Sequence, residues 1–274
     1  MPDEPLPDGV PGGAPGGPLD GVRGRTALVT GAGNGLGRAI ALALGGAGVR
    51  VVLAGRTRAN LEETARLLAG QGAEGRAVEA DVADPDSVAS LAEAIAGEDL
   101  SIVVNCAGVA GPVKPLTEVE PDEWDAVFAA NVRGTYLVCR ALIPALLRHG
   151  SGDIINIASV SGKRPLALRT PYTASKMAVI GLTTTLGAEV GPLGIRVNSL
   201  SPGPVRGPRM ERNFRLEAAR LGITEREAEA AFASRAALGR LLEEDEVGRA
   251  VVAMLMMSGL HCADIDLSAG MVAR

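Results

Sequence analysis

The chain has few of the residues on which metal sites, disulfide frameworks and nucleic-acid interfaces depend. Its 274 residues include two histidines, three cysteines and only 2% aromatic residues. Cys106, Cys139 and Cys262 are far apart and never in CxxC spacing, so we expect neither disulfides nor a zinc cluster. A catalytic triad or multi-histidine metal site would depend on His149, at the end of an apolar helical pattern, or on His261. We therefore expect no metal and a reducing, cytoplasmic location.

Charge and apolar runs argue against nucleic-acid and membrane partners. The 32 acidic residues outnumber the 27 basic ones, which gives a net charge of -5 and no positive field for a phosphate backbone. The longest stretches without a charged residue, 100–113 and 250–263, have 14 residues each. Such stretches are shorter than the roughly 20 residues that a helix needs to cross a bilayer. We expect neither kind of partner.

The first residues differ in composition from the remainder of the chain. Residues 1–20 hold six prolines and five glycines with several acidic residues, the opposite of a basic segment followed by an apolar signal core. This composition predicts a disordered tail over 1–21. No later linker or repeat appears, and 47% apolar residues can fill a large core. We predict one domain over 22–274.

Short apolar runs alternate with longer helical patterns, as is typical of a parallel sheet covered on both faces. The expected strands are 26–30, 49–54, 75–79, 100–105, 152–157, 195–200 and 265–267. The expected helices are 36–46, 59–70, 85–96, a long one broken near Asn131 and ending by His149, and 170–190. Asp84 before Pro85 is a good N-cap. The predicted fold is α/β: a single-domain, doubly wound, Rossmann-like parallel sheet of seven strands.

A segment near the C-terminus interrupts this alternation. Residues 202–240 begin with a loop rich in proline and glycine and continue as charged helical patterns that contain Phe214 and Phe232. Thr224 and Glu227 have the spacing of a capping box. The position above the carboxyl ends of a parallel sheet favours a substrate lid over about 206–240, and the alternative is a solvated helical hairpin that contributes only to packing.

A glycine-rich turn follows the first strand and precedes a helix. Glycines permit a tight turn and close approach of the backbone to a pyrophosphate, and the helix N-terminus favours the anion. We therefore predict a dinucleotide-binding turn. It consists of Thr30, Gly31, Ala32, Gly33, Asn34, Gly35, Leu36 and Gly37.

The end of the second strand favours NADP over NAD. An NAD-binding chain is expected to carry an acidic residue there, on the ribose hydroxyls. This chain has Arg56 and Arg58 instead, so a 2′-phosphate would meet guanidinium groups. The alternative is that both arginines are ordinary surface residues at the start of a helix.

Tyr172, Lys176 and Ser159 form a second constellation. Tyrosine and lysine four residues apart share one helix face. Bringing a phenol pKa from about 10 to near neutrality takes about 4 kcal/mol, and a cation at about 5 Å contributes about 3 kcal/mol. Tyr172 can then transfer a proton while Ser159 holds the substrate oxygen. With a dinucleotide, this predicts hydride transfer between a carbonyl and an alcohol.

These residues resemble the classical short-chain dehydrogenase/reductase family over about residues 22–274. The resemblance implies a catalytic tetrad of Asn131, Ser159, Tyr172 and Lys176, with Asn131 at a helix kink and holding a water that relays protons towards Lys176. Lys176 would also bind the nicotinamide ribose. The other cofactor-binding residues implied are Asp81 and Val82 beside the adenine, Asn105, Cys106, Ala107 and Gly108 on the adenosine side, and Pro202, Gly203 and Val205.

Three departures from the family pattern stand out. Cys106 replaces the second asparagine of the usual Asn-Asn-Ala-Gly. Gly207 replaces a common threonine that contacts the cofactor, a loss for which Arg206 or Arg209 would compensate. The C-terminal run 264–270 differs from the usual pattern, which makes the last strand and the tetramer contacts less certain.

The predicted function is NADP(H)-preferring interconversion of a ketone and a secondary alcohol on a small-molecule substrate. The resemblance implies a homotetramer, with a dimer as the alternative. A rival interpretation is a catalytically silent dinucleotide sensor or scaffold. A substrate variant is a 3-oxoacyl-carrier-protein reductase, in which Arg209, Arg212 and Arg215 would dock the acidic carrier.

Overall fold

The computed structural model describes residues 21–164 and 166–272. Residues 1–20 of the expected tail lie outside this part of the chain. Gly21 lies in a turn that leads into the first strand.

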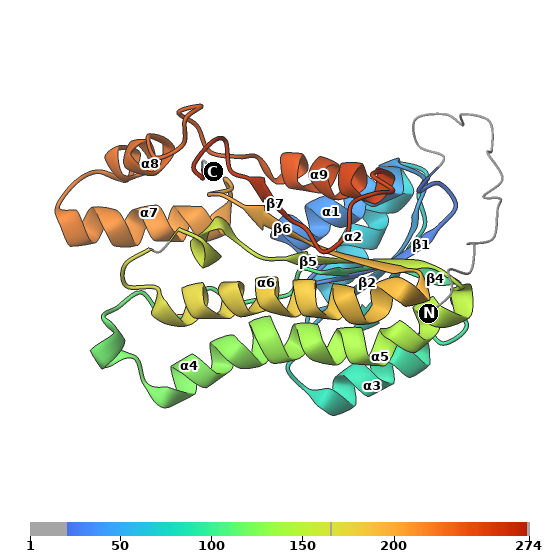
Figure 1. The fold of residues 1–274 in the computed structure, drawn as a ribbon. Coiled ribbons are helices and arrows are strands. Elements are labelled where there is room, and N and C mark those ends of the chain that lie inside the picture. The colour runs from blue at the N-terminus through green and yellow to red at the C-terminus, as the bar shows by residue number, and fades with distance from the viewer. Residues whose placement is uncertain (1–20, 165, 273–274) are drawn as a thin grey trace, which may run out of the picture.

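Seven strands form one parallel sheet in the order β3-β2-β1-β4-β5-β6-β7, which confirms the predicted doubly wound fold (Figure 1). Their bounds are β1 Thr26–Thr30, β2 Arg50–Gly55, β3 Gly75–Glu79, β4 Leu100–Asn105, β5 Gly152–Ile157, β6 Ile195–Pro202 and β7 Asp264–Leu267. The largest difference from expectation is in β6, which continues through Pro202. It does so because its last residues pair with β7, from Ser199 with Asp264 to Pro202 with Leu267.

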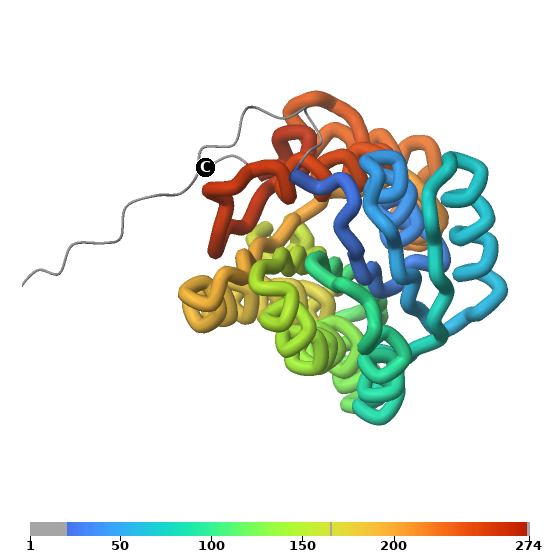
Figure 2. The backbone as a smooth tube through the Cα atoms, turned by 90° about the vertical axis from the view of Figure 1, so that its right-hand side faces the viewer, coloured from blue at the N-terminus to red at the C-terminus, as the bar shows by residue number. Residues whose placement is uncertain are grey.

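Helices cover both faces of the sheet, so the molecule has three layers (Figures 1 and 2). One face carries α1 (Gly35–Gly46), α2 (Arg58–Gly70) and α9 (Glu244–Met256). The other carries α3 (Pro85–Ala94), α5 (Gly134–His149) and α6 (Thr170–Val190). The short elements are η1 (Leu116–Glu118), α4 (Pro121–Phe128), η2 (Ala129–Arg133), η3 (Val160–Gly162) and η4 (Gly191–Leu193). As expected, Asp84 caps α3, since its Oδ1 accepts from the Asp86 backbone N at 3.0 Å.

Residues of β1 pack alternately into two apolar cores. Ala27 and Val29 belong to the core under α1, with Leu44, whereas Leu28 belongs to the core under α5, with Val138. Because side chains of a strand point alternately to opposite faces, a strand covered on both sides is apolar throughout. This explains why the continuous apolar runs predicted the central strands well.

The break predicted near Asn131 lies inside the long helical run α4–η2–α5. The break is one π-helical segment, η2, inside a continuous run of 29 residues, Pro121–His149. By length and composition this run could cross a membrane. In the fold, however, Leu137, Leu142 and Leu146 are buried in the core under α5, so the run serves as a core helix.

The predicted lid is a pair of helices, α7 (Pro208–Leu221) and α8 (Glu225–Ala233), which extends beyond the carboxyl ends of the strands (Figure 1). The capping box of α8 is confirmed, because the Glu227 backbone N donates to Thr224 Oγ1 at 3.2 Å. The two helices have an apolar cluster of their own. Its buried members are Met210, Phe214, Ala218, Ala228, Phe232 and Leu241.

Candidate active site

The strand order reverses between β1 and β4, and a cleft opens at the carboxyl ends of these strands. Open parallel sheets bind ligands at such a reversal. The cleft has a volume of about 900 Å³. It is lined by segments that follow β1 to β6 and by the first turn of α7, so the fold brings distant parts of the sequence to one place.

The glycine turn lies at one end of the cleft with geometry that requires glycine. Gly31 has φ +69°, and a Cβ there would lie 3.0 Å from the Ala107 Cα. A Cβ on Gly37 would lie 2.2 Å from the Gly31 carbonyl oxygen. The turn therefore packs backbone against backbone and leaves the N-terminus of α1 open to the cleft, where Gly33, Asn34, Gly35 and Leu36 also line it. This cradle fits a dinucleotide pyrophosphate.

Thr30 and the buried Ala32 do not line the cleft, unlike the other residues of the predicted turn. The Thr30 side chain binds the backbone instead. Its Oγ1 accepts from the backbone N of Cys106 at 3.0 Å and of Ala107 at 3.1 Å. The side chain thus holds the segment after β4 against the glycine turn. Arg38, which the sequence argument missed, has a similar structural role because its Nη2 donates to the Gly33 carbonyl oxygen.

The corner after β2 and β3 holds Arg56, Asp81 and Val82, as predicted, and all three line the cleft. Arg56 is exposed. Arg58 instead forms an ion pair with Glu62, at 2.8 Å between Nε and Oε1. Of the two arginines, Arg56 is the one placed toward a ligand. Asp81 also accepts from the Ala83 backbone N at 3.0 Å.

The segment after β4 only partly matches the expected cofactor contacts. Cys106, Ala107 and Gly108 line the cleft. Asn105 is buried, and its Nδ2 donates to Asn156 Oδ1 at 2.9 Å. Its side chain therefore faces the core between β4 and β5, away from a ligand. Burial raises the pKa of the Cys106 thiol to about 11, although Lys176 and Arg209 oppose the shift.

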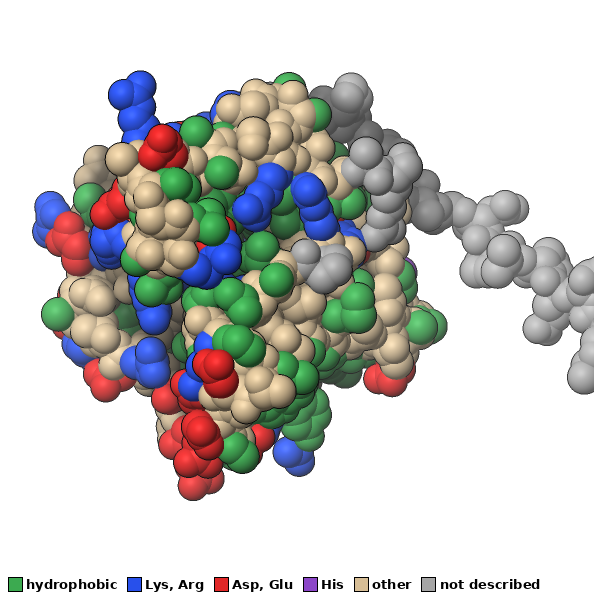
Figure 3. Space-filling view, turned by 90° about the vertical axis from the view of Figure 1, so that its left-hand side faces the viewer, with side chains coloured by type: hydrophobic (Ala, Val, Ile, Leu, Met, Phe, Trp, Pro, Cys, Tyr) green, Lys and Arg blue, Asp and Glu red, His purple; other side chains and the backbone are tan. Residues whose placement is uncertain are grey.

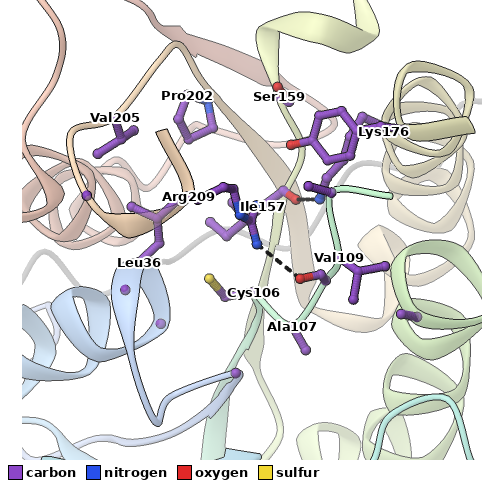
Figure 4. A pocket seen from close by; sticks show the side chains of 18 of the residues that line it. Leu36, Cys106, Ala107, Val109, Ile157, Ser159, Lys176, Pro202, Val205 and Arg209 are labelled. Atoms are coloured by element: carbon purple, nitrogen blue, oxygen red, sulfur yellow. Dashed lines mark hydrogen bonds between the residues drawn. The ribbon is translucent and has the colours of Figure 1, made fainter. Parts of the chain in front are cut away.

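Ser159, Tyr172 and Lys176 line the other side of the cleft, and Figure 4 shows Ser159 and Lys176 there. Lys176 is 6% exposed, and its Nζ donates to the Ile157 carbonyl oxygen at 2.7 Å and lies 5.9 Å from the Tyr172 ring centre. Ser159 Oγ accepts from the Ser161 backbone N at 3.1 Å, because Ser159 is the N-cap of η3. The Ser159 hydroxyl proton is thus available to a ligand.

The electrostatics of this group favour an ionisable phenol. Burial raises the pKa of Tyr172, but the charge of Lys176, followed by Arg209, the hydrogen bond to Ser159 and Arg169, outweighs burial and the net direction is downward. Burial also lowers the pKa of Lys176, which Tyr172 opposes. The two groups therefore each favour the charged form of the other.

Asn131 lies in η2 next to this group, as the resemblance implies. Its Oδ1 accepts from the Val109 backbone N at 2.7 Å, and its Nδ2 donates to Ser175 Oγ at 3.0 Å. A Cβ on Gly108 would lie 2.8 Å from Asn131 Oδ1 and 3.8 Å from Lys176 Nζ. Glycine at 108 is thus what allows Asn131 and Lys176 to approach the same strand end.

The loop after β6 contributes Pro202, Gly203 and Val205 to the cleft lining. Both arginines expected to compensate for Gly207 line the cleft, but the one whose side chain reaches the segment after β4 is Arg209. Its Nη2 donates to the Gly108 carbonyl oxygen at 3.1 Å (Figure 4). Arg206 instead pairs with Glu229 in the lid, at 2.6 Å, and with Glu243.

Ion pairs and hydrogen bonds explain the acidic residues of the unusual C-terminal run 264–270. Lys163, which follows η3, forms ion pairs with Asp264 and Asp266 of β7. Ser199 and Ser201 of β6 both donate to Asp264 Oδ1, at 2.7 and 2.8 Å. The acidic residues of β7 thereby join the last strand to the segment that carries Ser159.

Arg169 is the cleft residue that the sequence argument missed altogether. It is 7% exposed, lines the cleft and precedes α6 by one residue. Its spacing of three residues from Tyr172 was the one available signal, since a residue there lies close to the first turn of the helix.

Comparisons with known proteins show which sequences and structures this chain resembles. The model of the short chain dehydrogenase family matches residues 25–219. The (3R)-3-hydroxyacyl-CoA dehydrogenase of Homo sapiens is 42% identical over 198 residues, which are 68% of this chain and 76% of that protein. The D-threitol dehydrogenase of Mycolicibacterium smegmatis is 40% identical over 181 residues, 65% of this chain and 69% of that protein.

Solved structures extend the similarity to most of the chain. A variant of actinorhodin polyketide ketoreductase with NADPH has a TM-score of 0.86 at 31% identity, and the match covers 90% of this chain and 97% of that one. NAD⁺-bound xylitol dehydrogenase has a TM-score of 0.85 at 27% identity, covering 91% and 99%. The matched family model includes most of α7, whereas α8 and β7 lie beyond it.

Proposed function

We propose a cofactor and a proton donor for this chain, which belongs to the short chain dehydrogenase family and is an oxidoreductase of alcohols and ketones. The chain prefers NADP(H) and uses Tyr172 as acid and base. The observation that carries the assignment is the position of Tyr172 in the cleft, where Lys176 and Arg209 lower the pKa of its phenol despite burial. A phenol whose pKa is lowered in this way exchanges its proton with a substrate oxygen more readily than a free phenol does.

When bound in the cleft, a nicotinamide dinucleotide supplies or accepts the hydride. Tyr172 gives its phenolic proton to the substrate oxygen during reduction and takes the proton back during oxidation. The Ser159 hydroxyl donates a hydrogen bond to the same oxygen and stabilises the charge that develops there. The Lys176 ammonium, held by the Ile157 carbonyl, favours the phenolate through its charge.

Asn131 keeps the proton path in position. Its amide joins the Val109 backbone to Ser175, one residue before Lys176, and so fixes the segment after β4 against α6. A water held by Asn131 and Lys176 would pass protons between Tyr172 and solvent. We assign Asn131 this positioning role and the other three residues the chemistry.

The preference for NADP(H) rests on Arg56. It lines the cleft at the end of β2, where a carboxylate would repel a 2′-phosphate, and it forms no ion pair among the described residues. The similar structures were solved with NADPH in one case and NAD⁺ in another, so the fold accepts both cofactors. The guanidinium adds a charged partner for the phosphate.

A screen of ketones and secondary alcohols with NADP(H) and NAD(H), combined with cofactor binding followed by fluorescence, tests the proposal. We expect turnover with at least one carbonyl and tighter binding of NADPH than of NADH. Cofactor binding without turnover of any compound would favour a silent sensor or scaffold instead.

A carrier-bound 3-oxoacyl substrate is a second candidate, because one similar protein is named for 3-hydroxyacyl-CoA. Arg209 is exposed but donates to the Gly108 carbonyl oxygen in the cleft, so we assign it to the substrate and not to the carrier. Arg212 and Arg215 are exposed on α7. Charge reversal at these two positions should raise KM for a carrier-bound substrate and leave KM for a free ketone unchanged.

We further propose that the chain forms a homotetramer, or else a dimer, in the cytoplasm. Large apolar side chains lie exposed on two neighbouring helices, with Tyr136 47% exposed on α5 and Met177 58% exposed on α6. Exposed apolar side chains of this size are typical of association surfaces. Light scattering measures the oligomeric state, and cell fractionation tests the location.

A further inference from the structure

The end of the cleft beyond Tyr172 is lined by four arginines from three segments. Arg164 and Arg169 precede α6, Arg209 lies in the first turn of α7, and Arg235 follows α8. Figure 3 looks onto this end of the molecule, where Lys and Arg side chains surround a hollow. Within residues 21–164 and 166–272, none of the four forms an ion pair with a carboxylate.

Two carboxylates line the described cleft. Asp81 follows β3, at the corner that also holds Arg56. Glu244 Oε1 lies between the glycine turn and the segment before α7, 3.7 Å from the position of a Cβ on Gly35 and 2.8 Å from that of a Cβ on Gly207. Neither carboxylate pairs with the four arginines, so the end of the cleft beyond Tyr172 is positive.

Arg169 is the most deeply buried of these arginines. It is 7% exposed, and its one side-chain hydrogen bond among the described residues runs from Nη2 to Asn213 Oδ1. A guanidinium has five N–H donors, so donors are left for a ligand in the cleft. Burial lowers the pKa of Arg169, Tyr172 raises it, and the neighbouring Arg212 and Arg209 lower it again.

Such an environment is unfavourable for a charge unless a counterion arrives. Buried charges in proteins are normally paired, because desolvation of an unpaired ion is costly. If the side chain at position 169 only filled space, an apolar residue would suffice. If it only formed the hydrogen bond to Asn213, a neutral donor would suffice. An anionic ligand instead matches both the charge and the planar donor geometry of the guanidinium.

We propose that the substrate carries a carboxylate or phosphate close to its reacting carbonyl, and that Arg169 binds this anion with Arg209 beside it. Arg169 lies three residues before Tyr172, which places the anion within a few atoms of the carbon that is reduced. The exposed Arg164 and the half-buried Arg235, whose guanidinium lies over the Phe232 ring, attract the same charge from solution. This substrate class rests on the proposed function, because Tyr172 marks the position of the carbonyl.

Two matched pairs of ketones test the proposal with purified enzyme and NADPH. Acetoacetate is compared with methyl acetoacetate, and dihydroxyacetone phosphate with dihydroxyacetone, so each pair differs in one anionic group. The two pairs also separate a carboxylate from a phosphate. The quantity measured is the ratio of kcat/KM for the anion to that for its neutral partner. A change in the pKa of Tyr172 affects both members of a pair and cancels in this ratio.

We expect the wild type to prefer one anion, and Arg169→Met to lower that ratio at least about tenfold, as for loss of a charge-assisted hydrogen bond. Arg226→Met, which removes an exposed charge from α8, should leave the ratio unchanged. If Arg169→Met does not fold, Arg169→Lys must lower the same ratio, because it loses the planar donor fork. Glutarate, a dicarboxylate without a ketone, should raise the unfolding temperature of the wild type more than that of the variant.

Two outcomes separate this inference from the proposed function. Turnover of neutral ketones with no preference for either anion, or a ratio that Arg169→Met leaves unaltered, overturns the anionic substrate but not the oxidoreductase. Failure to reduce any ketone, charged or neutral, overturns the proposed function itself.

Discussion

The Lys176 ammonium lies 5.9 Å from the centre of the Tyr172 ring and donates its hydrogen bond to the Ile157 carbonyl, 2.7 Å away. Lysine therefore acts on the phenol across space, through its charge. At this distance and an effective dielectric near 20, one cation contributes about 3 kcal/mol, close to the value expected from the sequence spacing. The phenol also faces Arg209, which adds to the effect.

Replacement of the phenol tests the assigned acid and base directly. Tyr172→Phe keeps the ring and its packing but removes the proton that is transferred. We expect kcat to fall by about 10²–10⁴-fold or more, as for loss of a general acid or base. Binding of NADPH, followed by fluorescence, should stay nearly unchanged. Turnover close to the wild-type rate would eliminate Tyr172 as the proton donor.

Arg56 should determine the choice of cofactor. For Arg56→Ala we expect KM for NADP⁺ to rise about tenfold, the effect of a lost hydrogen bond to a charged group, while KM for NAD⁺ changes little. Arg58→Ala is the matched control, because Arg58 already pairs with Glu62. Equal effects of Arg56→Ala on both cofactors would contradict the assigned role.

The pH dependence of alcohol oxidation should respond to Arg209. Oxidation needs the deprotonated phenol, so its rate rises as pH passes the pKa of Tyr172. Arg209 lowers this pKa through its positive charge, and Arg209→Met should therefore raise the pKa and move the rise to higher pH. Arg226→Met should leave the profile in place. A shift to lower pH would contradict the electrostatic assignment.

Gly108 should tolerate no side chain. In Gly108→Ala the new Cβ would lie 2.8 Å from Asn131 Oδ1, so Asn131 must move or the segment after β4 must shift. We expect a loss of about 1–3 kcal/mol in stability from overpacking, together with reduced kcat. Gly97→Ala, where a Cβ would meet nothing within 4 Å, is the control. Measurements of thermal unfolding and kcat on both variants decide the point.

An ion-paired carboxylate at the opposite end of the sheet should contribute to the free energy of unfolding without affecting kcat. Asp153 is buried and pairs with Arg25 and Arg196, each at 2.7 Å, which joins β5 to β6 and to the residue before β1. Asp153→Asn should lower the free energy of unfolding by about 3 kcal/mol, since two guanidinium groups lose their counterion. Urea unfolding measures this loss, and kcat of the folded fraction should be unchanged.

The elements of the fold could be predicted from the sequence where their local patterns were strong. Central strands such as β4 are apolar on both faces, and the glycine turn ties β1 to α1, so both were predictable. The extension of β6 through Pro202 was not, because it depends on pairing with β7, as of Ser201 with Asp266, 65 residues further along the chain. Pairing between distant segments leaves little trace in one sequence.

The candidate site was predictable only where a motif carried it. The spacing of Tyr172 and Lys176 in the sequence predicted that they act together. The inward orientation of Asn105 could not be predicted, because it depends on a hydrogen bond to Asn156 of a neighbouring strand. Arg169 gave no motif, and its importance comes from burial beside Asn213 of the lid. A side chain whose role is created by tertiary neighbours cannot be assigned before those neighbours are known.

Because α7 and α8 share an apolar cluster of their own, the lid packs as a unit that is separate from the cores of the sheet. Phe214 and Phe232 pack with ring centres 5.6 Å apart inside a cluster that is separate from both cores of the sheet. Exchange of this segment for that of a relative would leave the buried faces of β1 to β7 intact. Substrate choice can therefore diverge during evolution by replacement of one modular insert, while Ser159, Tyr172 and Lys176, which lie outside the insert, are inherited and only the charge of Arg209 on the phenol changes with it.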